Sequence, residues 1–229
     1  MDIIPVIDIL DNHVVTALKG NRYAYQKINI KLYNSTEPIK IINRIVDIYS
    51  PKIIYIADLD AIISDRVNHN ILMKILKRFP KVDFWIDSGL NKINLDKSYN
   101  NYVPIFCSEK AKNFELISKK FKDYVCSIDY KNGIIGPKSI HRCIKTYPKK
   151  IIIMDLSRVG TKLKPNFHIV RKFITKKYKN EYYVAGGIRS MLDIKSAKLL
   201  GASGVLISSL LYMNKLRKFS FLKERANRA

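Results

Sequence analysis

Five aspartates each end a short apolar run of the sequence, and together they could carry out acid–base chemistry. The runs "IIPVID", "KIIYIAD", "VDFWID", "YVCSID" and "KIIIMD" end at Asp8, Asp58, Asp87, Asp129 and Asp155. Carboxylates that crowd one low-dielectric site repel one another, so the pKa of some of them rises. One protonated acid then stands beside one ionised base, as a proton-transfer reaction requires. Each aspartate taken alone is more typical of a helix cap or a turn.

The elements that would position these residues alternate along the chain. Three further β-rich runs, "NYVPIFC", "YYVAGG" and "SGVLIS", bring the number to eight, with segments of helical periodicity between them. This pattern predicts the α/β fold class and one domain over residues 1–229, a closed (βα)8 barrel (TIM barrel) rather than an open sheet. We expect helices in "HNILMKILKRF" and in "STEPIKIINRIVDIY", the latter with Ser35 or Thr36 as its cap and Pro38 in its first turn.

Two insertions suggest an internal repeat. "LDNHVVTALKGNRYAYQKINIKLYNS" after the first run predicts a hairpin and a long loop, and "YKNGIIG" after the fifth run is a smaller copy with a turn at Asn132-Gly133. Matching residues of the two halves are nearly equally spaced: Asp58 and Asp155 are 97 residues apart, Gly89 and Gly187 are 98 apart, and Ser108 and Ser208 are 100 apart. We therefore predict two half-barrels, of about residues 1–121 and 122–229.

Asp8 and Asp129 are matched by the same repeat, although the longer first insertion separates them by 121 residues. Active sites of such barrels lie at the carboxyl ends of the strands, so the two side chains are expected to face each other across that end. One of them could protonate a ring oxygen while the other removes a carbon-bound proton. We predict that Asp8 and Asp129 are the catalytic pair.

A glycine pair in "YYVAGGIRS" predicts a phosphate site. Glycine lets backbone N–H groups come close to an anion, and a helix that begins after the eighth strand would favour negative charge. The predicted phosphate ligands are Gly186, Gly187, Ser208 and Ser209. The alternative is a tight turn between a strand and a helix, with no ligand.

Several motifs resemble the HisA/HisF family of histidine biosynthesis over almost the whole chain. "IIPVIDILDNHVV" and "SIDYKNG" are similar to its first and fifth strands, and "MDLSRVGT", "AGGIRSMLDI" and "GASGVLISSLLYMNKL" to its last three. The resemblance implies a barrel isomerase that converts an aminoaldose phosphate to an aminoketose, with Asp8 as a catalytic aspartate. Other residues expected to contact substrate are Lys19, Arg22, Asp58, Asp87, Asp155 and Thr161. Lys19 and Arg22 could clamp anionic or carbonyl groups, or could be solvated loop charges.

"GNRYAYQKI", "IADLDAI", "WIDSGL" and "MDLSRVGT" resemble, more narrowly, a HisA-like branch of methanogens and methylotrophs, which implies a role in one-carbon (methanopterin- and methanofuran-linked) metabolism. HisA holds two phosphates, but "DSGLNK" and "CSEKA" replace its first phosphate-binding turns, and Val159 stands where it has an acid. Asp87 would repel a phosphate there, unless Lys92 or Lys110 neutralised it. We therefore expect a substrate with one phosphate, and authentic HisA activity is the alternative.

The composition limits the possible partners. The 42 Lys and Arg residues against 19 Asp and Glu residues give a net charge of +23, but the excess is spread along an Ile- and Lys-rich chain. We interpret it as compositional bias and expect no nucleic-acid partner; a non-catalytic barrel that binds nucleic acid or protein through its basic surface is the alternative. No apolar run suggests a membrane span or a signal peptide, which predicts a cytoplasmic protein.

The metal-ligand and thiol residues point to no cofactor. Cys107, Cys126 and Cys143 form no CxxC pair and are expected to be reduced and buried. The histidines are too scattered for a zinc signature: His13, His69, His141 and His168. We expect neither a metal nor a cofactor, and the sequence leaves the oligomeric state open.

Overall fold

The protein is a closed barrel of eight parallel strands in the structure, a computed structural model that describes residues 1–18, 21–28, 34–89, 99–110, 123–137, 148–174 and 180–208. The strands are β1 (Asp2–Leu10), β4 (Ile53–Asp58), β5 (Asp83–Asp87), β6 (Tyr102–Cys107), β7 (Val125–Tyr130), β8 (Lys150–Asp155), β9 (Glu181–Ala185) and β10 (Gly204–Ile207). They lie in this order around the barrel, and β10 pairs with β1 to close it. The predicted fold class and all eight predicted strands are confirmed.

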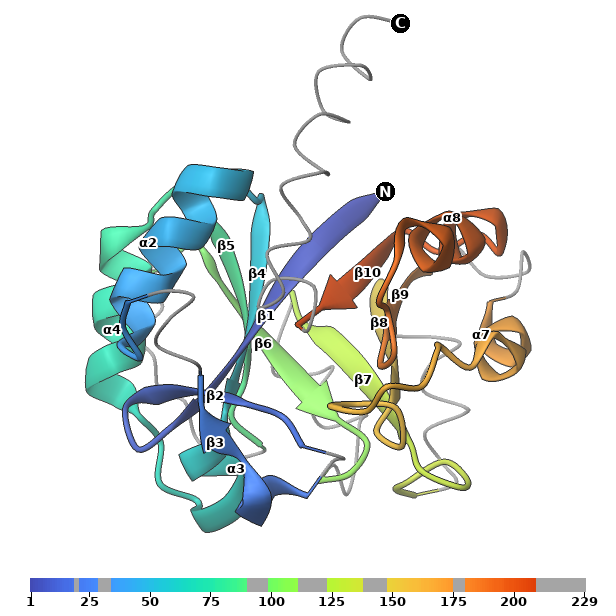
Figure 1. Ribbon diagram of the computed structural model, residues 1–229, viewed down its shortest axis with the longest axis horizontal. Coiled ribbons are helices and arrows are strands. Elements are labelled where there is room, and N and C mark those ends of the chain that lie inside the picture. The colour runs from blue at the N-terminus through green and yellow to red at the C-terminus, as the bar shows by residue number, and fades with distance from the viewer. Residues whose placement is uncertain are drawn as a thin grey trace, which may run out of the picture.

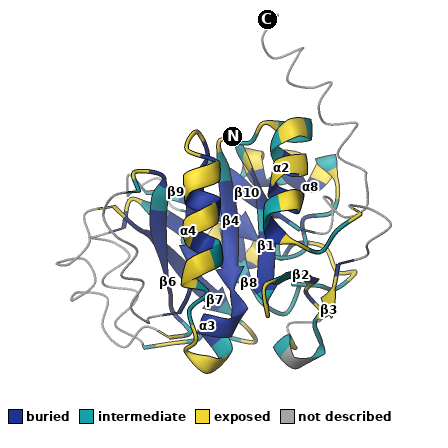
Figure 2. Ribbon diagram, turned by 90° about the vertical axis from the view of Figure 1, so that its left-hand side faces the viewer, coloured by how far each residue is buried: buried dark blue, intermediate teal, exposed yellow. Residues whose placement is uncertain are grey.

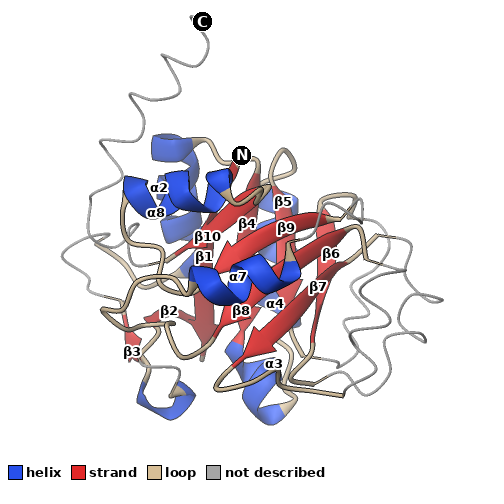
Figure 3. Ribbon diagram, turned by 90° about the vertical axis from the view of Figure 1, so that its right-hand side faces the viewer, coloured by secondary structure: helices blue, strands red, loops and turns tan. Residues whose placement is uncertain are grey.

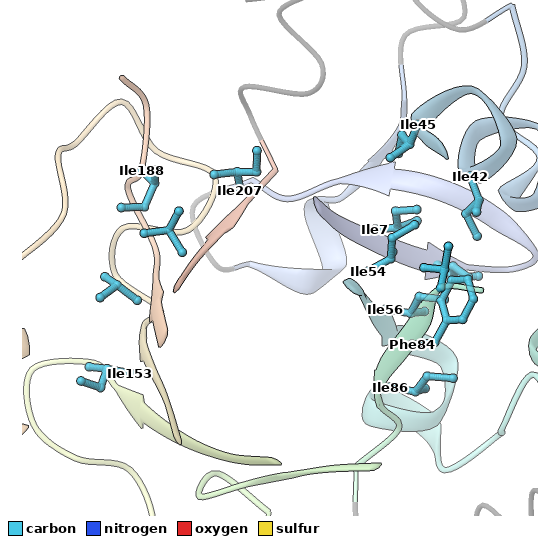
Figure 4. Packing of buried hydrophobic residues seen from close by; sticks show 14 of the residues in the cluster. Ile7, Ile42, Ile45, Ile54, Ile56, Phe84, Ile86, Ile153, Ile188 and Ile207 are labelled. Atoms are coloured by element: carbon cyan, nitrogen blue, oxygen red, sulfur yellow. The ribbon is translucent and has the colours of Figure 1, made fainter. Parts of the chain in front are cut away.

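The barrel wall separates two sets of apolar side chains. Residues that point outward, among them Ile7, Ile9 and Ile54, pack against helices, while those that point inward include Ile4, Tyr55 and Trp85. In Figure 4, Ile42 and Ile45 of a surrounding helix lie near Ile7 and Ile54 of the wall. The strands are thus covered on both faces, and Figure 2 shows them buried within a shell of half-exposed helices.

The described helices lie outside the strands: α2 (Pro38–Tyr49), α3 (Leu59–Ser64), α4 (His69–Arg78), α7 (Phe167–Phe173) and α8 (Met191–Leu199). In Figures 1 and 3, α2 and α4 cover one side of the barrel and α7 and α8 the other. Both helices predicted from periodicity, α2 and α4, are confirmed. The six-residue α3 was not expected, because so short an element carries no periodicity.

The predicted cap of α2 is wrong. Its N-cap is Glu37, and Pro38 is the first helical residue. The Ser35 hydroxyl instead accepts a hydrogen bond from the Glu37 N–H at 3.0 Å, and the Thr36 hydroxyl is bonded to His13 at 2.9 Å. Proline at the first position leaves one fewer N–H to cap, which explains why the helix begins without a side-chain cap.

The first insertion forms the expected hairpin. β1 pairs with β2 (His13–Thr16) through a turn in which Asp11 and Asn12 have φ of 47° and 61°, and β2 pairs with the short β3 (Gln26–Lys27). A 3-10 turn, η1 (Arg22–Ala24), precedes β3. The second insertion contains a short antiparallel bridge between Tyr130 and Ile134 around a left-handed Asn132. Among the described residues, no helix is long and apolar enough to cross a membrane.

Strand register sets two rows of side chains at the carboxyl ends of the strands. In the first half Asp8 pairs with Ala57, and Ala57 with Asp87. In the second half the row is Asp129, Met154 and Ala185. The predicted repeat matches each residue of the first row with one of the second, so the two half-barrels can be compared residue by residue at these positions.

Candidate active site

A cavity of about 370 Å³ opens at the carboxyl ends of the strands, inside the wall. All six residues of the two rows line it. Its charged lining consists of four acidic and four basic residues: Asp8, Asp87, Glu109, Asp129, Arg22, Lys131, Arg158 and Arg189. Asp8 and Asp129 therefore share one cavity, as a catalytic pair must.

Asp8 is buried and lacks hydrogen-bond donors. Only 8% of the residue is exposed, and its carboxylate forms no hydrogen bond with any part of the chain that the structure describes. Burial raises its pKa to about 7; the charge of Arg22 lowers it, and that of Asp87 raises it further. At neutral pH the side chain is therefore divided between acid and base forms.

Asp129 has the same pKa but a different environment. The Ser127 hydroxyl donates to Oδ1 at 2.8 Å, and Oδ2 accepts from the Glu109 N–H at 3.0 Å and the Ser108 hydroxyl at 3.3 Å. Burial raises the pKa to about 7, although the bonds from Glu109 and Ser127 act in the opposite direction. Asp129 is thus held in place by donors, whereas Asp8 faces the cavity without any.

Asp87 is the third buried carboxylate of the lining. It accepts hydrogen bonds from the Tyr55 hydroxyl at 3.2 Å, the Cys107 thiol at 2.8 Å and the Gly89 N–H at 3.0 Å. Burial raises its own pKa, and its charge raises the pKa of both Asp8 and Asp129. Burial also raises the pKa of Cys107 far above its usual range, so its thiol keeps its proton and donates it in the hydrogen bond to Asp87.

Asp58 and Asp155 do not line the cavity. Side chains alternate along a strand, and their neighbours Ala57 and Met154 take the inward positions. Asp58 caps α3 and accepts from Asn68 at 2.9 Å and 2.7 Å. Asp155 accepts from the Ser157 N–H at 3.0 Å and lies 3.7 Å from the guanidinium of Arg158. Both aspartates therefore support the loops that follow their strands.

The glycine pair forms one wall of the cavity. Gly186 and Gly187 have φ of 94° and 84°, in the left-handed region that glycine favours. A Cβ on Gly186 would lie 2.4 Å from the carbonyl oxygen of Asp155, and one on Gly187 2.8 Å from the backbone of Lys164 and Pro165. Both positions require glycine because of this close approach. Ser208 and Thr161 also line the cavity, whereas the predicted ligands Ser209 and Lys19, with Lys92 and Cys143, lie outside the described residues.

Arg22 lines the cavity, but its guanidinium is already paired. It donates to both carboxylate oxygens of Glu109, at 3.0 Å and 2.6 Å, in the bidentate geometry of a strong ion pair. The pair joins the first insertion to the residue after Ser108. The sequence prediction of an anion clamp at Arg22 did not anticipate this partner, since nothing in a one-dimensional pattern links residues so far apart.

Other lining residues were missed by sequence reasoning. Lys131, Arg158 and Arg189 follow β7, β8 and β9, and Tyr25 and Tyr55 reach the cavity from the first half. Burial raises the pKa of Tyr25 to about 12, so its phenol is neutral. The three basic residues could have been found from their places one to four residues after strand ends. Among the described residues, no group of His, Cys, Asp and Glu is arranged to hold a metal ion.

The chain is similar to known proteins over nearly its whole length. The family model described as "Histidine biosynthesis protein" matches residues 2–217. An uncharacterised protein of Methanocaldococcus jannaschii is 33% identical over 216 residues, which cover 93% of both chains. A 1-(5-phosphoribosyl)-5-((5-phosphoribosylamino)methylideneamino)imidazole-4-carboxamide isomerase of Archaeoglobus fulgidus is 28% identical over 233 residues, 94% of both chains.

An isomerase of the same name from Thermoanaerobacter is 28% identical over 244 residues, which cover 97% of this chain and 99% of its own. The match by the family model extends over all eight strands and over the residues that line the cavity. The chain therefore belongs to the HisA/HisF family of histidine biosynthesis proteins.

Proposed function

We propose that this protein is an isomerase that acts on a small metabolite with one phosphate group, using Asp8 and Asp129 as its acid–base pair. The observation that carries the proposal is that both aspartates and the Gly186–Gly187 turn line one cavity. The named relatives are isomerases, which supports the class of reaction.

The pair is suited to an aldose–ketose shift of the Amadori type. Such a reaction needs an acid to protonate the ring oxygen and open the sugar, and a base to remove the proton from the adjacent carbon. With both pKa values at about 7, the pair can supply one proton donor and one proton acceptor near neutral pH. Because the two groups titrate together, we expect a bell-shaped dependence of turnover on pH with its maximum near 7.

The second half-barrel is the proposed phosphate side. Gly186, Gly187 and Ser208 of this half line the cavity, as do its basic residues Lys131 and Arg158. Close approach of backbone to an anion is what paired glycines permit. The first half instead presents the carboxylates of Asp8 and Asp87, which would repel a second phosphate.

Crystals soaked in phosphate test the proposal. We expect one phosphate in the cavity, between the Gly186–Gly187 turn and Ser208. A phosphate bound beside Gly89 and Ser108, with none at Gly187, would contradict the assignment of the halves.

Authentic HisA activity is the second candidate, favoured by the full-length similarity to isomerases named for a substrate with two phosphoribosyl groups. Growth of a strain that lacks HisA, on medium without histidine, distinguishes the two. We expect weak growth or none when this protein is expressed at a modest level, because a substrate anchored at one end is misplaced over the aspartates. Robust growth would assign the chain to ordinary histidine biosynthesis.

The narrower one-carbon role is not part of this proposal, because neither the comparisons nor a described residue supports it. The alternative of a basic, non-catalytic barrel that binds nucleic acid remains a prediction that salt-dependent oligonucleotide binding would test. A buried pair of carboxylates inside the cavity favours catalysis over that alternative.

A further inference from the structure

The Arg22–Glu109 ion pair lines the cavity, but neither side chain donates or accepts a proton in the reaction proposed above. The two side chains are 26% and 28% exposed, so water reaches them only in part. In this bidentate pair, a carboxylate of the protein itself accepts hydrogen bonds that the guanidinium could otherwise donate to a ligand.

The repeat shows what stands at the same place in the other half. Ser108 matches Ser208, so Glu109 matches Ser209 in the sequence. The hydroxyl of Ser108 is fully buried and bonded to Asp129, as donor at 3.3 Å and as acceptor at 2.8 Å. Ser208 is half-buried and lines the cavity. The serine that could contact a ligand in the second half is therefore used internally in the first half.

The glycines differ in the same way. Gly187 lines the cavity, but its partner in the repeat, Gly89, does not, and its N–H donates to Asp87 at 3.0 Å. The first half thus lacks free donors where the second half has a candidate anion site. Among the described residues, Arg22 is the cation whose charge acts on both Asp8 and Asp87.

The backbone fixes the position of the Glu109 carboxylate. The Glu109 N–H donates to Asp129 at 3.0 Å, directly after the buried Ser108. The side chain extends from this point to Arg22, which η1 holds on the far insertion. Glu109 therefore reaches Arg22 from a fixed strand end rather than from a loose loop.

We infer that Glu109 is a specificity-determining residue: its carboxylate takes the place at Arg22 that a second phosphate of a substrate would occupy, and so restricts the cavity to ligands with one phosphate. The inference rests on the proposed function and names the residue that enforces it. Removal of the carboxylate leaves a cation without a partner, which favours binding of an external anion.

The test is a titration of the Glu109→Gln variant with inorganic phosphate, followed by NMR at the Arg22 Nε–H and at the amide of Gly187. In the variant we expect the Arg22 signal to move at a phosphate concentration roughly 10- to 100-fold lower than in the unaltered protein. A gain in affinity of this size corresponds to one charge-assisted hydrogen bond. The Gly187 signal should respond alike in both proteins. Glu109→Ser, which copies Ser209, repeats the measurement if the glutamine variant fails to fold.

Two controls make the result specific. Glu181→Gln removes the same charge from a glutamate paired with Lys149 at 3.3 Å, on the first residue of β9 and away from the cavity lining. It should leave Arg22 unaffected, and the double variant Arg22→Gln/Glu109→Gln should bind phosphate only at the Gly187 site, as the unaltered protein does. An Arg22 signal that moves equally in the unaltered protein, or in Glu181→Gln, would overturn the inference. If the Gly187 amide signal moved in none of the proteins on addition of phosphate, that result would instead contradict the phosphate site of the proposed function.

Discussion

The two half-barrels share a backbone plan but present different chemistry to the cavity. Row for row, Asp8, Ala57 and Asp87 in the first half match Asp129, Met154 and Ala185 in the second. Each half contributes one aspartate of the proposed catalytic pair. Only the first half adds further carboxylates to the lining, those of Asp87 and Glu109, and only the second adds a glycine turn. The two aspartates therefore occupy matching positions in the two halves, while the residues around them differ enough to give the cavity two unlike ends.

The two aspartates themselves should be equally necessary. We expect Asp8→Asn and Asp129→Asn each to reduce turnover by about 10²- to 10⁴-fold, the usual contribution of a general acid or base. Turnover would be measured with the substrate that gives the named isomerases their name, or with any monophosphate found to react. A loss of only a few-fold in one variant would show that the halves are unequal in catalysis and would remove that aspartate from the pair.

The same substitutions should separate the halves in stability. Below pH 3.8 Asp8 is protonated in both the folded and the unfolded chain, so its ionisation does not change the free energy of unfolding. Above this pH the unfolded chain ionises first, so stability is lost until the folded group ionises at about 7. Three pKa units correspond to about 4 kcal/mol at most, and Asp8→Asn should recover that amount at pH 8 and almost none at pH 3.

Asp129→Asn is the matched control for this effect. An asparagine NH₂ group cannot accept from the donors on Ser127, Ser108 and Glu109, so we expect this variant to gain less than Asp8→Asn or to lose stability. Denaturant unfolding at both pH values measures the difference. Equal gains would mean that the donors around Asp129 do not distinguish the two sites.

The matched glycines should show the smallest effect. Gly89→Ala and Gly187→Ala both place a side chain at positive φ, of 67° and 84°, at a cost of roughly 1–2 kcal/mol. Only at Gly187 would the new Cβ also approach backbone, at 2.8 Å, while at Gly89 the nearest atom is 3.8 Å away. We expect the free energy of unfolding to fall about 2 kcal/mol further in Gly187→Ala. Equal losses in thermal unfolding would show that the second turn can relax.

The sequence predicted the eight strands because each is a β-branched, apolar run that ends at an aspartate, a glycine or a polar residue. The equal spacing of Asp58, Gly89 and Ser108 to Asp155, Gly187 and Ser208 also led to the prediction of two matching halves, since a repeat preserves spacing. The sequence could also have predicted which residues face the inside of the barrel. Side chains alternate along β4 and β8, so Ala57 and Met154 point inward, and the next residues, Asp58 and Asp155, point outward. That rule alone would have separated Asp58 and Asp155 from Asp8, Asp87 and Asp129.

The Arg22–Glu109 pair could not be predicted in this way. Its two residues are joined by no periodicity, motif or repeat, and they meet only because the first insertion folds back over the end of β6. Likewise, the donation of the Cys107 thiol to Asp87 depends on how two neighbouring strands are staggered. Contacts of this kind follow from the closed barrel and not from local sequence.

One edge of β1 is divided between two partners, and this has a consequence for how the chain folds during synthesis. Asp8, Ile9 and Leu10 pair with the adjacent β2, whereas Asp2 to Pro5 pair with β10, just over two hundred residues later. The hairpin part can form at once, but the other part stays an open edge until the ribosome has made β10, and open edges invite aggregation. Pro5 lacks an N–H and weakens that edge as a template for other chains. We therefore expect closure by β10 to be a late step in folding. The backbone amides of Asp8 to Leu10 should then be protected from hydrogen exchange long before those of Asp2 to Ile4.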